Sequence, residues 1–362
     1  MTHNCNLSCK YCYSGRKFED CMSFETAQKI VEFAIKITPP KQIINFGFFG
    51  GEPLLCFDLI QKIITFIRQK EEKTQNSVSL NIVTNGTLLN KSILNFIKRE
   101  NINLCLSIDG PEKVHNLNRL YKDGRGSYED TFQSLKLVLN NLNRFQVNAV
   151  YSPNTIDSLV DVVSFFDQQE VNAIHLNPNI LTSWEGDIYL KLRSKFMELA
   201  TYYIHCYREN REMAINLIDS KLLLLIKKGY EEKDRCCLGE EEWAFAPSGN
   251  IYPCERFIGE DDNEKFCLGN IHSGFNQKCI CKVLKNRGNH DKKCMNCNLQ
   301  RYCMNWCGCT NYYTTGKSDL VSTFICENEK AIIDAAKYVL VNLKDNDIFI
   351  NHLMKYYNDN NQ

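Results

Sequence analysis

The sequence predicts an α/β fold with a parallel sheet over residues 1–230, followed by a loop-rich region that is dense in cysteine. Two observations support this prediction. Short apolar runs of β type alternate with amphipathic helical patterns along the first 230 residues, and this alternation is typical of βαβ units. Twelve of the 19 cysteines lie from Cys236 to Cys326, where Gly, Asn and Pro interrupt the chain. This change in composition predicts a domain boundary near residues 230–236.

The individual elements follow from periodicity. Runs with the length and residue types of buried strands are Ile43–Phe49, Val78–Val83, Ile102–Ile108, Gln146–Tyr151 and Val171–Leu176. Helical spacing of apolar residues predicts helices at Phe24–Ile37, Phe57–Gln69, Leu88–Arg99, Tyr128–Leu142 and Thr155–Asp167, then at about 187–208, 213–228 and Glu327–Leu343. We therefore expect three parts: residues 1–230, 231–330 and a helical tail, 331–362.

The composition of the 362 residues excludes several classes of protein. Hydrophobic residues make up 44% and charged residues 24%, as in ordinary globular chains. Lys and Arg together number 43, as do Asp and Glu, so no basic field predicts nucleic-acid binding. The sequence contains no apolar run long enough to span a membrane and no signal-peptide core at its start. We expect a cytoplasmic protein without nucleic-acid or membrane partners.

The cysteine count is the abnormal feature of the composition. An odd number of cysteines in a long chain without a secretion signal favours metal or thiol chemistry over disulfides. Four cysteines are isolated in the first part of the chain, and we expect them to be small buried apolar residues. They are Cys21, Cys56, Cys105 and Cys206.

The first cysteine motif is Cys5-x3-Cys9-x2-Cys12. Three thiolates at this spacing can bind three irons of one [4Fe–4S] cluster and leave the fourth iron open to a small ligand. Zinc is a weaker alternative, because no fourth ligand lies at the short spacing of a zinc finger. None of the four residues before Cys5 has the pattern of a strand. Either the chain is a fragment, or its start is misassigned, or the sheet lacks its first strand.

With Tyr11 directly before the third cysteine, this motif resembles the signature of the radical S-adenosylmethionine (SAM) superfamily. Gly50-Gly51-Glu52 follows the strand predicted at Ile43–Phe49 and resembles the family loop that holds the amino group of SAM. Glycines allow close backbone approach, and a carboxylate pairs with an ammonium group. A plain glycine turn between a strand and a helix is the alternative.

The resemblance also implies cofactor contacts from the ends of later strands, where the active sites of barrels gather. The residues that it implies near the SAM ribose or the reacting centre are Thr84, Asn85, Ser107 and Asp109. Ser127, at the start of a predicted helix, is a candidate contact for the SAM carboxylate. Turn capping and helix capping remain the alternatives for these five residues.

The second cysteine motif is Cys294-x2-Cys297-x5-Cys303-x3-Cys307, followed by Cys326. With the cysteines before it, the motif resembles the SPASM domain, which holds two auxiliary [4Fe–4S] clusters in radical SAM enzymes. The resemblance implies a distal cluster on Cys294, Cys297, Cys303 and Cys326, and a proximal cluster on Cys236 (or Cys237), Cys254 and Cys307. A pair of structural zinc sites is the alternative.

The proximal cluster lacks a fourth ligand at the matching position. The candidates are Cys237, Cys267, Cys279 and Cys281, or the position is open to a substrate thiolate. Glu255 directly follows Cys254, where sulfatase-maturing relatives have an aspartate base. We expect Glu255 to act as a catalytic proton acceptor, with an ion pair as the alternative.

The resemblance implies a partial (β/α)6 barrel followed by a SPASM extension. It further implies reductive cleavage of SAM to methionine and a 5′-deoxyadenosyl radical, which abstracts hydrogen from a peptide. The leading prediction is a thioether crosslink in a ribosomally made precursor peptide. Alternatives are carbon–carbon crosslinking, sulfatase maturation and, in another class, a non-catalytic iron–sulfur electron carrier. Implied partners are the peptide, a separate peptide-recognition protein and a flavodoxin- or ferredoxin-type electron donor.

Overall fold

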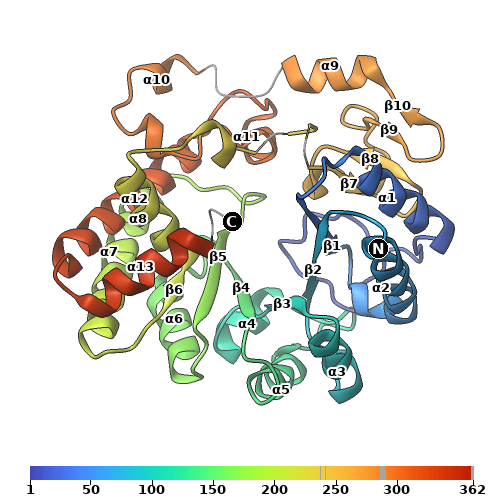
Figure 1. The fold of residues 1–362 in the computed structure, drawn as a ribbon. Helices are drawn as coiled ribbons and strands as arrows, with labels where there is room; N and C mark the ends of the chain where they lie inside the picture. The colour runs from blue at the N-terminus through green and yellow to red at the C-terminus, as the bar shows by residue number, and fades with distance from the viewer. Residues whose placement is uncertain (237, 241, 286–290, 360–362) are drawn as a thin grey trace. The chain divides into compact units, whose positions relative to one another are not determined.

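The computed structural model describes residues 1–236, 238–240, 242–285 and 291–359 (Figure 1). The chain forms two compact units, and each unit combines segments that are separate in the sequence. Unit 1 comprises Met1–Ile108, His115–Phe145 and Cys237–Lys285, and unit 2 comprises Asp109–Val114, Gln146–Cys236 and Asn286–Gln362. The division into residues 1–230, 231–330 and 331–362 stays a prediction.

Unit 1 contains three parallel strands whose connections run through helices. Strand β1 pairs with β2 and β2 pairs with β3, both in parallel, and parallel neighbours need a crossover of this kind. The strands are β1 (Ile43–Phe48), β2 (Ser77–Thr84) and β3 (Ile102–Ser107), and the helices around them are α1 (Phe24–Ile37), α2 (Phe57–Glu71) and α3 (Lys91–Arg99).

Local sequence signals explain where the helices of unit 1 begin. The Ser23 side chain accepts a hydrogen bond from Thr26 N at the start of α1, and Asn90 accepts one from Ile93 N at the start of α3. Such side chains satisfy backbone donors that the first turn leaves open. The apolar faces of the three helices and of the strands form one buried cluster. This core holds the ends of the strands in place for the loops that follow them.

The remaining described elements of unit 1 are two helices, two single turns and a small sheet. They are the single turns η1 (Pro53–Cys56) and η4 (Glu255–Phe257), the helices α5 (Tyr128–Leu139) and α9 (Gln277–Lys285), and an antiparallel sheet of β7 (Ala244–Phe245), β8 (Asn250–Tyr252), β9 (Gly269–Asn270) and β10 (Gly274–Phe275). The sequence predicted only loops for the segment that forms this sheet. Strands of two or three residues are too short to show a periodic pattern.

Unit 2 repeats the alternation of parallel strands and helices. Strand β4 pairs with β5 and β5 with β6 in parallel, and α12 packs along α7 and α8. The strands are β4 (Gln146–Tyr151), β5 (Ala173–Pro178) and β6 (Ala214–Ile215). The helices and turns are η2 (Ile156–Ser158), α6 (Leu159–Gln168), α7 (Ile188–Arg208), α8 (Asn216–Lys227), η3 (Glu232–Asp234), α10 (Lys292–Met295), η5 (Gln300–Tyr302), α11 (Gly308–Thr315), α12 (Thr323–Leu343) and α13 (Asp347–Asp359), and α4 (Glu112–Asn118) begins in this unit.

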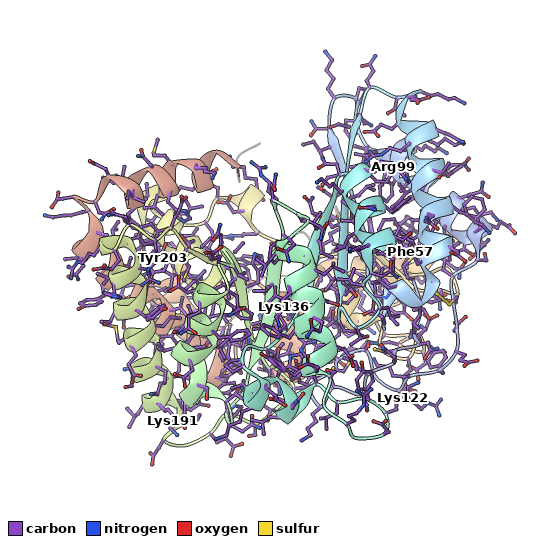
Figure 2. All side chains as sticks on the ribbon, turned by 90° about the horizontal axis from the view of Figure 1, so that it is seen from below. Phe57, Arg99, Lys122, Lys136, Lys191 and Tyr203 are labelled. Carbon is purple, nitrogen blue, oxygen red and sulfur yellow. A yellow bond between two sulfur atoms is a disulfide. The ribbon has the colours of Figure 1, made fainter. Side chains whose placement is uncertain are left out.

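A buried polar cluster links three helices of unit 2. Tyr203 on α7, labelled in Figure 2, donates a hydrogen bond of 2.8 Å to Asp219 Oδ1 on α8. His352 Nε2 on α13 lies 2.8 Å from the same oxygen. Asp219 Oδ2 also accepts from Ile215 N at 2.6 Å. Because each buried group has a partner, the cluster fixes the C-terminal helix without leaving a polar atom unsatisfied.

The predicted α/β class and the alternation of strands and helices are confirmed. The helix Phe24–Ile37 and the strand Gln146–Tyr151 have the predicted bounds. The last predicted helix begins earlier than Glu327, because Ser322 caps α12 by accepting a hydrogen bond from Ile325 N. Residues 1–4 form no strand, as expected. None of the described helices is long and apolar enough to cross a membrane.

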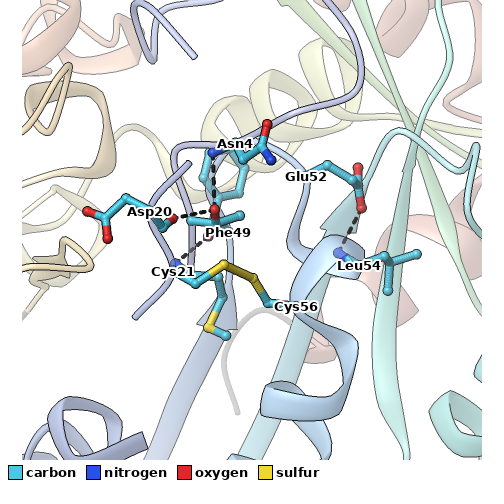
Figure 3. Close-up of a disulfide and its surroundings, with 9 residues drawn as sticks. Asn4, Asp20, Cys21, Phe49, Glu52, Leu54 and Cys56 are labelled. Atoms are coloured by element: carbon cyan, nitrogen blue, oxygen red, sulfur yellow. Dashed lines mark hydrogen bonds between the residues drawn. A yellow bond between two sulfur atoms is a disulfide. The ribbon is translucent and has the colours of Figure 1, made fainter. Parts of the chain in front are cut away.

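A disulfide joins Cys21 to Cys56 in unit 1 (Figure 3). The prediction that both residues are buried apolar thiols is wrong, since they are paired and Cys21 is exposed. Cys21 forms an isolated β-bridge with Thr2, in the segment that runs beside the loop after β1. The disulfide joins residues 35 positions apart, and sequence spacing alone does not reveal it. Cys105 and Cys206 are buried, as predicted.

Candidate active site

The cysteines of the first motif lie on one loop of unit 1, ahead of α1. Backbone hydrogen bonds hold this loop against the end of α4 and the residues after it, from Ser8 N to Leu120 O at 2.7 Å and from Lys10 N to Asn118 O at 3.0 Å. Within the loop, Cys12 N donates to Cys9 O at 3.1 Å. Backbone pairing therefore fixes a segment whose sequence has no helical or strand pattern.

Hydrogen-bond donors surround the first of these sulfurs. Cys5 Sγ accepts from Leu7 N at 3.4 Å and from Asn85 Nδ2 at 3.8 Å. Burial nevertheless raises the pKa of the Cys5 thiol. Bound iron takes the thiolate form, and N–H donors to sulfur stabilise that form. The donor set around Cys5 therefore fits an iron–sulfur cluster.

Lys17 supplies a cation to the last cysteine of the motif. Its Nζ lies 3.0 Å from Cys12 Sγ, and Ser14 Oγ lies 3.2 Å from the same sulfur. Burial raises the pKa of Cys12, but the charge and hydrogen bond of Lys17 and the contacts from Ser14 outweigh it, so the pKa is lowered. Sequence reasoning missed Lys17, although its place five residues after Cys12 was the available signal.

The two glycines after β1 are required by the N-terminal segment. Gly51 N donates to Thr2 O at 2.8 Å. A Cβ on Gly51 would lie 2.0 Å from Asn4 O, and one on Gly50, at φ +148°, would lie 2.5 Å from Thr2 O. These contacts explain the glycines without a cofactor. Their predicted approach to SAM stays a prediction.

Glu52 is buried and accepts three hydrogen bonds from its own unit. The donors are Leu54 N at 3.0 Å, drawn in Figure 3, Thr84 Oγ1 at 2.7 Å and Asn85 N at 2.8 Å. Burial raises the pKa of Glu52 to about 7, although the three hydrogen bonds act to lower it. Asn85 Nδ2 continues to Asn6 Oδ1 at 2.9 Å. The structure thus joins three of the predicted cofactor residues to the cysteine loop.

A cavity of about 840 Å³ lies within unit 1 beside β1. Gly50, Gly51, Tyr13, Cys254 and Glu255 are among the residues that line it. Cys254 Sγ donates to Glu255 Oε2 at 3.3 Å. Burial, and after it the charge of Glu255, raises the pKa of Tyr13 well above its ordinary value. The structure therefore brings the predicted catalytic carboxylate and one predicted cluster ligand to the same cavity as the two glycines.

Other predicted cofactor residues have partners within the protein. Asp109 accepts from Val150 N at 3.0 Å, and Ser127 Oγ donates to Arg119 O at 2.9 Å. The Arg119 guanidinium also lies 5.4 Å from the centre of the Tyr11 ring. The predicted roles of these residues in binding SAM, and that of the buried Ser107 at the end of β3, stay predictions.

Five cysteines of the second motif lie in unit 2, mostly at the ends of short elements. Cys294 is in α10, Cys303 ends η5, Cys307 precedes α11 and Cys326 lies in the first turn of α12, with Cys297 between α10 and η5. In the described part of the chain, no three His, Cys, Asp or Glu side chains converge on one metal ion. A [4Fe–4S] cluster binds each thiolate through a different iron, so it does not require such convergence.

Buried donors without acceptors lie between two of these cysteines. No described residue accepts a hydrogen bond from Asn305 Nδ2 or from Trp306 Nε1, and both atoms are buried. A buried unsatisfied donor costs free energy, and the sulfur atoms of an anionic cluster would accept from it. The thiols of Cys303 and Cys307 and the donors between them therefore fit the surroundings of iron–sulfur clusters.

The remaining predicted ligands stay untested. Cys236 belongs to unit 2 and Cys254 to unit 1. Of the four candidates for the fourth proximal ligand, Cys237 lies outside the described residues. Cys267 Sγ donates to Gly269 O at 3.3 Å. The remaining two, Cys279 and Cys281, are on α9.

Comparisons with known proteins agree on the family. Residues 1–166 match the model of the radical SAM superfamily. The cysteine-type anaerobic sulfatase-maturating enzyme of Clostridium novyi (strain NT) is 26% identical over 323 residues, 84% of this chain and 85% of that enzyme. The radical SAM cyclopropyl synthase TigE of Paramaledivibacter caminithermalis is 26% identical over 372 residues, 92% of this chain and 74% of the synthase.

A solved structure shows that the fold is shared. Native anSMEcpe with bound AdoMet and the Cp18Cys peptide superposes with a TM-score of 0.79 at 20% sequence identity, and the match covers 95% of this chain and 97% of the other. The predicted fold is thereby confirmed. The family match and the named relatives confirm an enzymatic function, with a [4Fe–4S] cluster and SAM as the cofactors that the matched family implies. Residues 1–166 therefore form a radical SAM domain, and the chain is an enzyme.

Proposed function

We propose that this enzyme modifies a ribosomally made precursor peptide and forms a thioether bond between a cysteine sulfur and a carbon of that peptide. With the enzyme class established, the alternative of a non-catalytic electron carrier is set aside. A bound peptide in the solved structure that shares this fold supports a peptide substrate. A separate peptide-recognition protein and a flavodoxin- or ferredoxin-type electron donor remain proposed partners.

The observation that carries the proposal is the place of Glu255 in unit 1. Its carboxylate accepts from Cys254 Sγ, beside a cavity of about 840 Å³ that the Gly50–Gly51 loop also lines. This volume falls in the range of natural ligand pockets. A carboxylate beside such a cavity is suited to take the proton of a substrate thiol as its sulfur bonds to carbon.

The atoms and electrons of the proposed step balance. When bound, the cluster and SAM supply a 5′-deoxyadenosyl radical that removes one hydrogen atom from carbon, and an auxiliary iron–sulfur cluster supplies the acceptor for one electron. Glu255 takes the thiol proton. The C–H and S–H bonds break and one C–S bond forms. For its part, the protein positions the carboxylate, encloses the cavity and limits the access of water.

The test uses the whole enzyme, reconstituted anaerobically and supplied with SAM, a reductant and a cysteine-containing precursor peptide. Mass spectrometry should show a product that has lost two hydrogen atoms, keeps its sulfur and no longer reacts with a thiol-alkylating reagent. Glu255→Gln should slow product formation while SAM cleavage continues. Glu260→Gln is the matched control, because Glu260 pairs with Arg16 in an exposed contact. Equal product rates in both variants would reject the role of Glu255.

Sulfatase maturation is the second candidate, and the similarity to the Clostridium novyi enzyme favours it. The same experiment separates the two functions when a sulfatase-derived peptide is the substrate. Conversion of its cysteine to an aldehyde removes the sulfur and creates a group that reacts with hydrazides, whereas a thioether product keeps the sulfur. An aldehyde from this peptide, with no crosslink in any precursor peptide, would replace thioether formation by sulfatase maturation. A carbon–carbon crosslink would leave the cysteine open to alkylation.

A further inference from the structure

Unit 2 contains a fully buried ion pair that the proposed function does not use. Lys221 Nζ on α8 lies 2.8 Å from Glu329 Oε2 on α12, and the two side chains are only 4% and 6% exposed. Burial lowers the pKa of Lys221, but the charge of Glu329 outweighs it and the pKa is raised. Lys221 is therefore a buried ammonium, next to a ring face of Tyr230 at 5.5 Å.

This pair holds the backbone on both sides of one cysteine. Lys221 Nζ donates to Tyr302 O at 3.0 Å, and Met304 N donates to Glu329 Oε2. The residue between Tyr302 and Met304 is Cys303. Its thiol is in the field of both charges: burial raises its pKa, the carboxylate raises it further and the ammonium opposes them. Lys221 and Glu329 thus bind the backbone on either side of this cysteine.

The surroundings of Cys303 also include donors that lack an acceptor. The ring of Trp306 contacts Tyr230 edge to face, with 5.2 Å between the ring centres. Trp306 Nε1 and Asn305 Nδ2 are buried, and no described residue accepts a hydrogen bond from either atom. Burying two charges costs several kcal/mol, and well-packed apolar residues often stabilise a fold equally well. The retained charges and the open donors therefore point to an anionic group at Cys303.

We propose that the Lys221–Glu329 pair sets the reduction potential of the [4Fe–4S] cluster bound through Cys303, with the ammonium raising it and the carboxylate offsetting most of that effect. This inference rests on the auxiliary cluster in the proposed function. Reduction adds one negative charge to a cluster, so a nearby cation favours the reduced state and an anion opposes it. Such charges act strongly in a buried site, where water screens them little.

Glu329→Gln is the primary variant in the test. It keeps an oxygen that can accept from Met304 N and removes the negative charge, while the anionic cluster keeps Lys221 protonated. The double variant Lys221→Met/Glu329→Gln removes both charges and returns the pair to net zero. Glu198→Gln is the matched control, since Glu198 pairs with Lys195 at 2.8 Å on the exposed side of α7 in the same unit.

The measurement is a redox titration of the reconstituted full chain, followed by electron paramagnetic resonance, with iron and sulfide content determined for each variant. Glu329→Gln should shift the potential of one auxiliary cluster upward, the double variant should return it toward the wild-type value, and Glu198→Gln should leave it unchanged. At full iron content, an unshifted potential in Glu329→Gln, or equal shifts in the single and double variants, would overturn the inference.

Iron content and peptide products separate this inference from the proposed function. A wild-type chain with only the SAM-binding cluster, about four irons, would overturn the inference, whether or not the peptide is modified. Crosslinked peptide together with an unshifted potential would overturn the inference alone. Shifted potentials without any peptide product would keep the inference and reject the proposed function.

Discussion

Cys12 in unit 1 and Cys303 in unit 2 each lie beside a lysine ammonium, but the two sites differ in their charge balance. Lys17 contacts Cys12 at 3.0 Å, no carboxylate of the described residues is bonded to that sulfur, and the pKa of the thiol is lowered. Lys221 at Cys303 is paired with Glu329, and burial together with that carboxylate raises the pKa of the thiol. A cation near a cysteine therefore does not predict the direction of the thiol pKa shift until the charge paired with that cation is known.

The difference is consistent with two kinds of proposed cluster site. The loop of Cys5 and Cys12 is short, partly open and held by backbone hydrogen bonds to a neighbouring segment. The surroundings of Cys303 are built from α8 and α12, with a buried ion pair between them. We infer an accessible site for the SAM-binding cluster in unit 1 and an enclosed, electrostatically tuned site in unit 2.

Removing a proposed cluster ligand from the enclosed site should have the largest effect. Cys294→Ala or Cys326→Ala should lose one auxiliary cluster and most of the protease resistance of unit 2, because loop-rich segments fold around their metal. Iron analysis and limited proteolysis measure both effects. Cys206→Ala, a buried cysteine of the same unit, should keep all its iron. Full iron and unchanged resistance in the ligand variants would reject the assignment.

Breaking the ion pair should have the next largest effect. Lys221→Met leaves the Glu329 carboxylate buried without its cation, which costs about 3–5 kcal/mol. Urea unfolding of the anaerobically reconstituted, iron-loaded chain should show this loss, and Lys221→Met/Glu329→Gln should recover most of it. Lys195→Met, at an exposed pair, should change stability by less than about 0.5 kcal/mol. Equal losses in the single and double variants would contradict the account.

The sequence predicted the proximity of the N-terminal candidate residues but not the ion pair beside Cys303, and the reason is distance along the chain. Glu52, Thr84 and Asn85 follow neighbouring strands, so a parallel sheet places them at the same edge, as the hydrogen bonds confirm. Lys221 and Glu329 are 108 residues apart on helices with no signal for their contact. They come together only when α8 packs against α12.

The short elements and the disulfide show the same limit. The strand Gln146–Tyr151 was predicted with its observed bounds because six residues show an alternating pattern. The strands of two or three residues from β7 to β10 carry no period, and the contact between Cys21 and Cys56 joins residues 35 positions apart without a signal in the sequence. Sequence patterns therefore predicted a cluster chemistry for the cysteines, while their electrostatic surroundings required the fold.

Removing a donor to Glu52 should have an intermediate effect on unit 1. Thr84→Val deletes the hydroxyl that donates at 2.7 Å to this buried carboxylate, and the loss should be about 1–3 kcal/mol. Thr84→Ser retains the donor and should stay closer to the wild type. Urea unfolding and hydrogen exchange of Leu54 N, which donates to the same carboxylate, check this prediction. Equal stability of the two variants would show that the hydroxyl contributes nothing.

The smallest expected effect is a pH dependence of the C-terminal helix. Burial lowers the pKa of His352, but hydrogen bonds and charge from Asp219 and Glu212 outweigh it, so the folded pKa is above the ordinary 6.5. The stabilisation is fully present below about pH 6.5. It is lost as the pH rises through the raised folded value.

Limited proteolysis of α13 as a function of pH measures this effect. Cleavage should increase on the alkaline side in the wild type, and His352→Gln should remove that pH dependence. His205→Gln changes an exposed histidine on α7 and should leave the dependence in place. An identical pH profile in His352→Gln and the wild type would show that this histidine does not control the docking of α13.

The most direct test of the central claim compares the wild type with Cys5→Ala/Cys9→Ala/Cys12→Ala by electron paramagnetic resonance, before and after SAM is added to the reduced protein. In the wild type, SAM should change the signal of one cluster and 5′-deoxyadenosine should form. The triple variant should lose about four irons, the SAM-dependent signal and all 5′-deoxyadenosine. It should keep the signals of the clusters proposed at the C-terminal cysteines. A triple variant that still cleaves SAM would contradict the account.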